Sequence, residues 1–315
     1  MCSLFGVLDY GRSLSNKKLS KMVSVLAKEC EIRGTDATGV AYTFKNKLSI
    51  YKRPVPAHRL KFRVPHGCHT IMGHTRLTTQ GSEKYNQNNH PFYGYTEDMP
   101  FALAHNGVLH NDKQLRLTEK LPKTNIQTDS YIAVQLIEKQ NNLDFESLRY
   151  MAESVEGSFT FTVLDQTGNL LIVKGDSPMC VYHYPSLGFY IYASTEEILK
   201  RAVKKLSLQW QTHEKIGIEC GDILKIDTVG DVEREQFTHE HIRPWQWGGR
   251  CYGYQYSVED SALADDYWKE LRFISGTFGY SPDDVDRYKR LGYPPDVVEE
   301  IFYCGDGQME NYMCI

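Results

Sequence analysis

Short apolar runs occupy most of the first three quarters of the chain. The run at 3–9 is continuous, as in a strand that is buried on both faces, and several later runs alternate with polar residues. The segments predicted as strands are 3–9, 38–44, 47–52, 69–75, 100–105, 158–165, 169–174, 179–184, 188–193, 208–213 and 222–227.

Apolar residues recur at helical spacing between these runs. The first such segment begins at Ser15 and ends near Gly34, with an apolar face from Leu19 to Ala27. Further helices are predicted at 129–139, with Thr128 or Asp129 as the N-cap, at 144–154 and at 195–205. Strand runs that bracket helices predict an α+β layered domain over residues 2–240.

The pattern changes after residues 243–249, where proline and paired glycines predict a boundary. A helix is expected at 262–274. Two segments, 279–285 and 292–298, then resemble each other, and in each a Pro-Asp pair suits the first turn of a helix. The sequence therefore predicts a small helical appendage at 245–315, whose role it does not indicate.

Charge and aromatic residues separate the same two parts. Residues 245–315 hold 13 acidic and six basic side chains and three of the four tryptophans. The whole chain carries a net charge of −4, which gives no broad surface for nucleic acid. No apolar run has the length of about 18 residues that a membrane span needs. The eight scattered cysteines are typical of reduced thiols, and the expected compartment is the cytoplasm.

Cys2 is the first candidate for chemistry. Removal of the initiator methionine would leave Cys2 with both a thiol and a free α-amine. An α-amine with a pKa of about 8 is a usable base at neutral pH, so one residue would supply a nucleophile and its base. Taken alone, a cysteine at a chain end is weak evidence for a catalytic role.

Several further motifs strengthen the evidence for a catalytic role of Cys2. They are Arg33-Gly34-Thr35-Asp36, Gly73-His74-Thr75-Arg76-Leu77-Thr78-Thr79, Asn89-His90-Pro91-Phe92, His105-Asn106-Gly107-Val108, Asp129, Glu156-Gly157-Ser158-Phe159, 174–178 and 193–196. Together with Cys2, in this order and spacing, they resemble the glutaminase domain of the class II glutamine amidotransferases, which are N-terminal nucleophile hydrolases. The resemblance covers residues 2 to about 230 and implies a four-layer αββα sandwich.

The resemblance also implies a role for each matching residue. Cys2 is the nucleophile, and Asn106 and Gly107 form the oxyanion hole, which an Asn-Gly tight turn could also build. Arg76 binds the α-carboxylate of glutamine and Asp129 its α-ammonium. The other expected roles are pocket lining for Thr78 and His90, and organisation of the nucleophile for Arg33 and Asp36.

Other site types receive less support. The polar stretch 79–89 matches the family's loop that closes over glutamine, although a plain surface loop would have the same composition. His66, Cys68, His69 and His74 match no standard zinc spacing, so no metal is expected. No phosphate-binding glycine loop occurs, and no cofactor is expected.

The predicted function is hydrolysis of L-glutamine to glutamate and ammonia through a Cys2 thioester. No sequence after residue 230 resembles a phosphoribosyltransferase, and about 75 residues are too few for a pair of sugar-isomerase domains. The expected partner is therefore an ammonia-accepting synthase or partner subunit, and homo-oligomers stay open. Two alternatives remain: an N-terminal cysteine hydrolase of another linear amide, and a catalytically silent interaction protein that uses its C-terminal tail.

Overall fold

The computed structural model describes residues 2–97, 99–238, 268–269, 271–273, 275–291, 298 and 301–302. The chain divides into two compact units, Met1–Trp245 and Gln246–Ile315. The predicted boundary at 243–249 lies outside the described residues. No helix of the described part is both long and apolar enough to cross a membrane.

The first unit contains a seven-stranded antiparallel sheet with β1 in its centre, in the order β11-β9-β10-β1-β4-β2-β3. Leu4 of β1 pairs with His74 of β4, and Phe5 pairs with Ala193 of β10 on the other side. The strands are β1 (Ser3–Leu8), β2 (Ala37–Phe44), β3 (Lys47–Arg53), β4 (Thr70–Arg76), β9 (Cys180–Tyr184), β10 (Phe189–Ala193) and β11 (Glu214–Ile216).

A second antiparallel sheet has six strands in the order β13-β12-β8-β7-β6-β5. Its longest ladder joins β6 to β7, from Phe101 opposite Asp165 to Leu109 opposite Gly157. The strands are β5 (Phe92–Tyr95), β6 (Pro100–Leu109), β7 (Gly157–Asp165), β8 (Leu170–Lys174), β12 (Asp222–Ile226) and β13 (Val232–Gln236).

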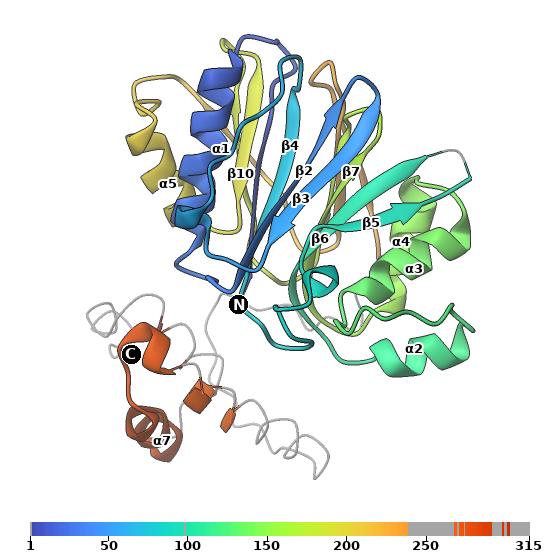
Figure 1. The fold of residues 1–315 in the computed structure, drawn as a ribbon, viewed down its shortest axis with the longest axis vertical. Coiled ribbons are helices and arrows are strands. Elements are labelled where there is room, and N and C mark those ends of the chain that lie inside the picture. Colours follow the sequence, from blue (N-terminus) through green and yellow to red (C-terminus); the bar gives the residue numbers. More distant parts are fainter. Residues whose placement is uncertain are drawn as a thin grey trace. The chain divides into compact units, whose positions relative to one another are not determined.

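Helices cover the outer face of each sheet (Figure 1). Helices α1 (Asn16–Cys30) and α5 (Glu196–Lys205) lie on the first sheet, and α3 (Tyr131–Gln140) and α4 (Phe145–Ser154) lie on the second, beside the short α2 (Asp112–Thr118). Three one-turn 3-10 helices are η1 (Ala57–Arg59), η2 (Asn86–Asn88) and η3 (Ser275–Phe278). The four layers confirm the predicted αββα sandwich.

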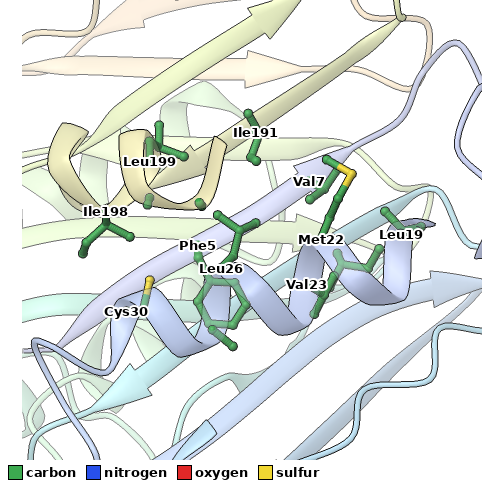
Figure 2. Packing of buried hydrophobic residues seen from close by; sticks show 14 of the residues in the cluster. Phe5, Val7, Leu19, Met22, Val23, Leu26, Cys30, Ile191, Ile198 and Leu199 are labelled. Carbon is green, nitrogen blue, oxygen red and sulfur yellow. The ribbon is translucent and has the colours of Figure 1, made fainter. Parts of the chain in front are cut away.

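Each interface between layers has its own apolar core. Figure 2 shows Leu19, Met22, Val23 and Leu26 of α1 packed against Phe5 and Val7 of β1, next to Ile198 and Leu199 of α5. Leu4 and Leu8 of β1 face the other way, into the core between the two sheets. Both faces of β1 are therefore buried, which explains why its sequence is a continuous apolar run.

One predicted strand is wrong, and four elements were not predicted. Residues 208–213 form turns, because α5 ends at Lys205 and Ser207 takes a left-handed conformation with φ +58°. This turn brings Leu208 back onto the core of α1 and α5, so its apolar character serves packing and not a strand. The sequence patterns did not predict α2, β5, β11 or β13, which are short or mostly exposed.

The second unit is described only in part. Helix α7 (Pro282–Arg290) begins at the first Pro-Asp segment, and Ser281 and Asp284 form a reciprocal capping box. Of the helix expected at 262–274, residues 268–269 and 271–273 are described and helical. The second Pro-Asp segment lies outside the described residues except for Val298, which is helical and buried.

Candidate active site

Cys2 immediately precedes the central strand β1, and its side chain is almost fully enclosed. The residue is 8% exposed, and its Sγ donates a 3.4 Å hydrogen bond to the carbonyl oxygen of Leu77. Ser3 pairs with Thr75, so Cys2 lies beside the end of β4 at Arg76. The antiparallel pairing of β1 and β4 thus brings together two sequence-predicted site residues that are 74 positions apart.

The thiol of Cys2 is held in its neutral form by its surroundings. Burial raises its pKa, and the negative charge of Asp129 acts in the same direction. The positive chain terminus, the hydrogen bond to Leu77 and the guanidinium of Arg76 lower the same pKa, but less than burial raises it. Formation of the thiolate therefore requires a base that takes the proton as attack occurs.

Arg33 and Asp36 connect the turn after α1 to the residues around the thiol. Nε of Arg33 donates a 3.0 Å hydrogen bond to the carbonyl oxygen of Cys2. Oδ2 of Asp36 accepts a 2.7 Å hydrogen bond from the backbone amide of Thr78, and its own amide donates to the carbonyl of Arg76. Both residues thus form hydrogen bonds with backbone positions next to the thiol.

Arg76 is buried at the end of β4, and its guanidinium is largely engaged. Nη1 donates to Oδ1 of Asn89 at 2.7 Å, and Nη2 donates to the carbonyls of Gln80 and Gly81 at 2.6 and 2.8 Å. Three of its five N–H groups are used, and Nε–H and one Nη1–H have no acceptor among the described residues.

Asn106 and Gly107 lie inside β6, which continues to Leu109. The tight turn considered for this Asn-Gly pair is therefore wrong: the strand continues because both residues pair with β7. Asn106 is fully buried, and neither its Oδ1 nor its Nδ2 has a hydrogen-bond partner among the described residues. Gly107 has φ +140°, and a Cβ there would lie 1.9 Å from the carbonyl oxygen of Ser158. Only glycine fits this backbone.

Asp129 lies between β6 and α3, but it does not cap the helix. Helix α3 begins at Tyr131 after Ser130, and Thr128 and Asp129, the two predicted caps, both precede this start. Oδ2 of Asp129 instead accepts a 2.7 Å hydrogen bond from the amide of Leu109. The carboxylate lies close enough to Cys2 and to Arg76 to influence the pKa of both groups. Cys2, Arg76 and Asp129 therefore form one electrostatic cluster.

The loop 80–83 is fixed to this cluster through its carbonyl groups. Arg76 holds the carbonyls of Gln80 and Gly81, while the amides of Asn88 and Asn89 hold those of Ser82 and Glu83. Four successive carbonyls thus accept hydrogen bonds from buried side chains. Asn88 was not predicted as a site residue, and only its position beside the Asn89-His90 motif could have indicated it.

His90 belongs to a group of three buried imidazoles behind the cluster, with His74 and His105. The ring of His90 lies 4.1 Å from that of His74, and Nε2 of His74 donates to the carbonyl of His105 at 3.0 Å. This bond joins β4 to β6 at the residue before Asn106. Burial lowers the pKa of all three imidazoles, so they are neutral at pH 7.

Thr78 and His90, the remaining predicted site residues, have buried polar atoms. The hydroxyl of Thr78 is buried and has no hydrogen-bond partner among the described residues, and the same is true of both ring nitrogens of His90. The described part of the chain holds no group of three or more His, Cys, Asp and Glu side chains arranged to bind a metal ion. The polar groups that meet at the end of β4 are thus a thiol, a guanidinium, a carboxylate and an amide.

The chain is similar in sequence to known proteins. Residues 74–201 match the family model of the glutamine amidotransferase domain. The chain is 26% identical over 310 residues to a glutamine–fructose-6-phosphate aminotransferase of Fusobacterium nucleatum, covering 90% of this chain and 48% of that protein. The corresponding protein of Sulfurisphaera tokodaii is 29% identical over 191 residues, covering 58% of this chain and 31% of that protein.

Solved structures show the same fold. A glutamine phosphoribosylpyrophosphate amidotransferase from B. subtilis superposes with a TM-score of 0.60 at 19% identity, over 76% of this chain and 50% of that one. The chain contains a class II glutamine amidotransferase domain. The chain spans about half the length, or less, of the curated relatives that it matches. The matched segment 74–201 of the amidotransferase domain includes Arg76, Asn106 and Asp129.

Proposed function

We propose that this domain hydrolyses L-glutamine to glutamate and ammonia, with Cys2 as the N-terminal nucleophile after removal of Met1. The observation that supports this most directly is the pairing of opposite charges around one thiol. The guanidinium of Arg76 and the carboxylate of Asp129 both act on the Cys2 thiol, with opposite effects on its pKa. An α-amino acid carries the complementary pair, a carboxylate and an ammonium, at one end.

The proposed reaction proceeds through a thioester. The α-amine of mature Cys2 takes the thiol proton as sulfur attacks the side-chain amide carbon of glutamine, forming a C–S bond. The resulting oxyanion accepts hydrogen bonds from Nδ2 of Asn106 and the amide of Gly107. The C–N bond then breaks, and the leaving nitrogen takes the proton and departs as ammonia. Water hydrolyses the γ-glutamyl thioester, which releases glutamate and restores the thiol.

We further propose which N–H groups of Arg76 bind the substrate. Its Nε–H and one Nη1–H have no acceptor among the described residues, and they are the donors proposed for the α-carboxylate. The same guanidinium holds the carbonyls of Gln80 and Gly81. Thr78 and His90, whose buried polar atoms have no partner among the described residues, are proposed to line the pocket, and Arg33 and Asp36 to hold its backbone.

The acceptor of the ammonia is a separate part of the proposal. Curated relatives about twice as long as this chain carry the name glutamine–fructose-6-phosphate aminotransferase. We propose residues 2–240 as the glutaminase domain, with ammonia delivered to a synthase on another polypeptide or segment. The cytoplasmic compartment stays a prediction.

The test combines mass, binding and turnover. Intact-mass measurement should show loss of Met1, and the protein should release ammonia from L-glutamine. Cys2→Ala should abolish turnover and should retain glutamine binding by calorimetry, because Arg76 and Asp129 are unchanged. Substantial turnover by Cys2→Ala would contradict the proposal. Preference for N-acylated or decarboxylated glutamine would favour another amide hydrolase, and retained Met1 with no turnover would favour the silent interaction protein.

A further inference from the structure

The side chain of Lys52 in β3 contacts the segment that carries the His90-Pro91 motif. Its Nζ donates hydrogen bonds to the carbonyls of Asn89 and Pro91, at 2.5 and 3.0 Å. The two carbonyls flank His90 in the chain, so one ammonium fixes both ends of this short segment. Nζ also lies 5.0 Å from the centre of the Phe92 ring.

The surrounding backbone is built for this contact. Gly39 of β2 pairs with Lys52, and a Cβ at Gly39 would lie 2.1 Å from the carbonyl oxygen of His90 and 2.8 Å from Cβ of Lys52. The absence of a side chain at Gly39 lets the segment approach the strand. The amide Nδ2 of Asn86 donates in turn to the carbonyl of Lys52 at 3.0 Å, so the contact runs in both directions.

The segment fixed by Lys52 carries the side chain that holds Arg76. Oδ1 of Asn89 accepts from Nη1 of Arg76, and Nδ2 of Asn89 donates to the carbonyl of Glu83 at 2.8 Å. Lys52 therefore acts on the backbone of Asn89, and Asn89 acts on both the guanidinium and the loop 80–83. Only one residue separates the lysine from Arg76 in this series of contacts.

The charges around Lys52 come from the same region. Among the described residues no carboxylate forms an ion pair with Lys52, and the cation that faces it is Arg76 of β4. The positive charge of Lys52 acts on the titratable rings of His74 in β4 and of His90, and both rings are neutral. Burial, assisted by Arg76, lowers the pKa of Lys52 to about 8. Its charge, and with it the strength of its two hydrogen bonds, therefore changes near physiological pH.

We propose that Lys52 is a positioning residue for glutamine binding: by holding the carbonyls of Asn89 and Pro91, its ammonium keeps Asn89 against Arg76 and so keeps the guanidinium oriented for the substrate carboxylate. This inference rests on the proposed role of Arg76. It concerns affinity for glutamine and not the chemical step, because Lys52 does not contact the thiol or the oxyanion donors.

The kinetic test uses three variants of the whole chain. Lys52→Met removes the charge and keeps the aliphatic stem, Lys52→Arg keeps the charge, and Lys47→Met makes the same change at an exposed position of β3. Lys52→Met should raise the KM for glutamine roughly tenfold at pH 7, the loss expected for charge-assisted hydrogen bonds, with little change in kcat. Lys52→Arg should restore most of the affinity, and Lys47→Met should resemble the wild type.

The pH profile separates positioning from a merely structural role. Between pH 7 and 9 the KM of the wild type should rise as Lys52 loses its proton. Lys52→Arg should lack this component, because a guanidinium stays charged over that range. Identical pH profiles for the wild type and Lys52→Arg, or an unchanged KM in Lys52→Met, would overturn the proposal.

Amide hydrogen exchange keeps the inference distinct from the proposed function. At pH 7 and without glutamine, exchange in peptides covering 79–92 should be faster in Lys52→Met than in Lys47→Met or the wild type. If the wild type does not hydrolyse glutamine, the proposed function fails, and this measurement still decides whether Lys52 anchors the segment. Equal exchange in all three proteins would contradict the anchoring.

Discussion

Oδ2 of Asp129 accepts a 2.7 Å hydrogen bond from the backbone amide of Leu109, which joins the start of α3 to the end of β6. The contact lies two residues beyond Gly107. The carboxylate that is proposed to bind the substrate ammonium is therefore also the group that holds the end of the strand carrying the proposed oxyanion donors. The proposed substrate-recognition site and the proposed oxyanion site thus share one side chain.

Asp129→Asn separates these two tasks. The amide oxygen of Asn can still accept from Leu109, so the melting temperature should change little, while the KM for glutamine should rise by roughly tenfold to a hundredfold. The pKa of the Cys2 thiol should fall, since Asp129 now raises it. Steady-state kinetics and the pH dependence of alkylation by iodoacetamide check the two effects. Asp129→Ala should lose stability as well, because the bond to Leu109 is lost.

At Asn106, a substitution is expected to lower activity without lowering stability. Its buried amide has no hydrogen-bond partner among the described residues, so Asn106→Leu should leave the melting temperature equal or higher. Loss of an oxyanion donor should lower kcat by roughly a hundredfold to a thousandfold. A fall in stability together with normal kcat would contradict the assignment.

Asn111 offers a matched control for this substitution. Its amide donates to the carbonyl of Ser154 and accepts from the amide of Glu156, both at 2.9 Å. Asn111→Leu should therefore destabilise the domain by about 1–3 kcal/mol in denaturant unfolding. The same chemical change thus has opposite consequences at two buried asparagines near the end of β6.

Gly107→Ala should prevent the strand from keeping its native backbone. The added Cβ would collide with the carbonyl of Ser158 at 1.9 Å, at a φ that residues with a side chain rarely adopt. A loss of at least about 3 kcal/mol in the free energy of unfolding is expected.

Two other glycines separate the causes of that loss. Gly67 has φ +87°, but an added Cβ would meet open space. Gly67→Ala should lower the free energy of unfolding by roughly 1–2 kcal/mol. Gly217→Ala meets no atom within 4 Å and should change stability by less than about 0.5 kcal/mol. Equal losses in all three variants would show that the collision with Ser158 is absent.

Acid should destabilise the domain through its buried imidazoles. Burial lowers the pKa of His74, His90 and His105, whereas the same groups in the unfolded chain take up protons near pH 6.5. The unfolded state therefore binds more protons below that pH, and stability falls as the pH falls, by roughly 1.4 kcal/mol per pH unit for each histidine. His90→Phe should reduce this slope, because it removes one of the three buried imidazoles.

The sequence predicted a layered α+β domain from its apolar runs, as at Leu4 and Phe5, and its resemblance to a known family implied the four-layer sandwich. It failed where a residue serves a distant contact. Leu208 was assigned to a strand because a helix-ending turn that packs on the core has the same apolar pattern. Asp129 was assigned to a cap because its partner, Leu109, lies 20 residues away. The Asn106-Gly107 pair was compatible with a turn, since its pairing with β7 depends on tertiary structure.

Lys52 shows the same limit for the site. A lysine in an alternating strand is typical of a solvent-facing position, and the carbonyls that it holds lie 37 and 39 residues later. Motif resemblance identified the residues expected to touch the substrate. The groups that hold them, such as Lys52 and Asn88, bond mainly to backbone carbonyls, which leave no mark on the sequence.

Chain termini are ordinarily the first parts of a domain to lose order, but Cys2 adjoins the middle strand of seven. β1 is paired on both sides and buried on both faces, so it belongs to the part of the domain that opens only on global unfolding. The position of Cys2, the proposed nucleophile, is therefore as persistent as the fold itself. The amine proposed for mature Cys2 would thus be held in place by a single strand in the middle of the sheet.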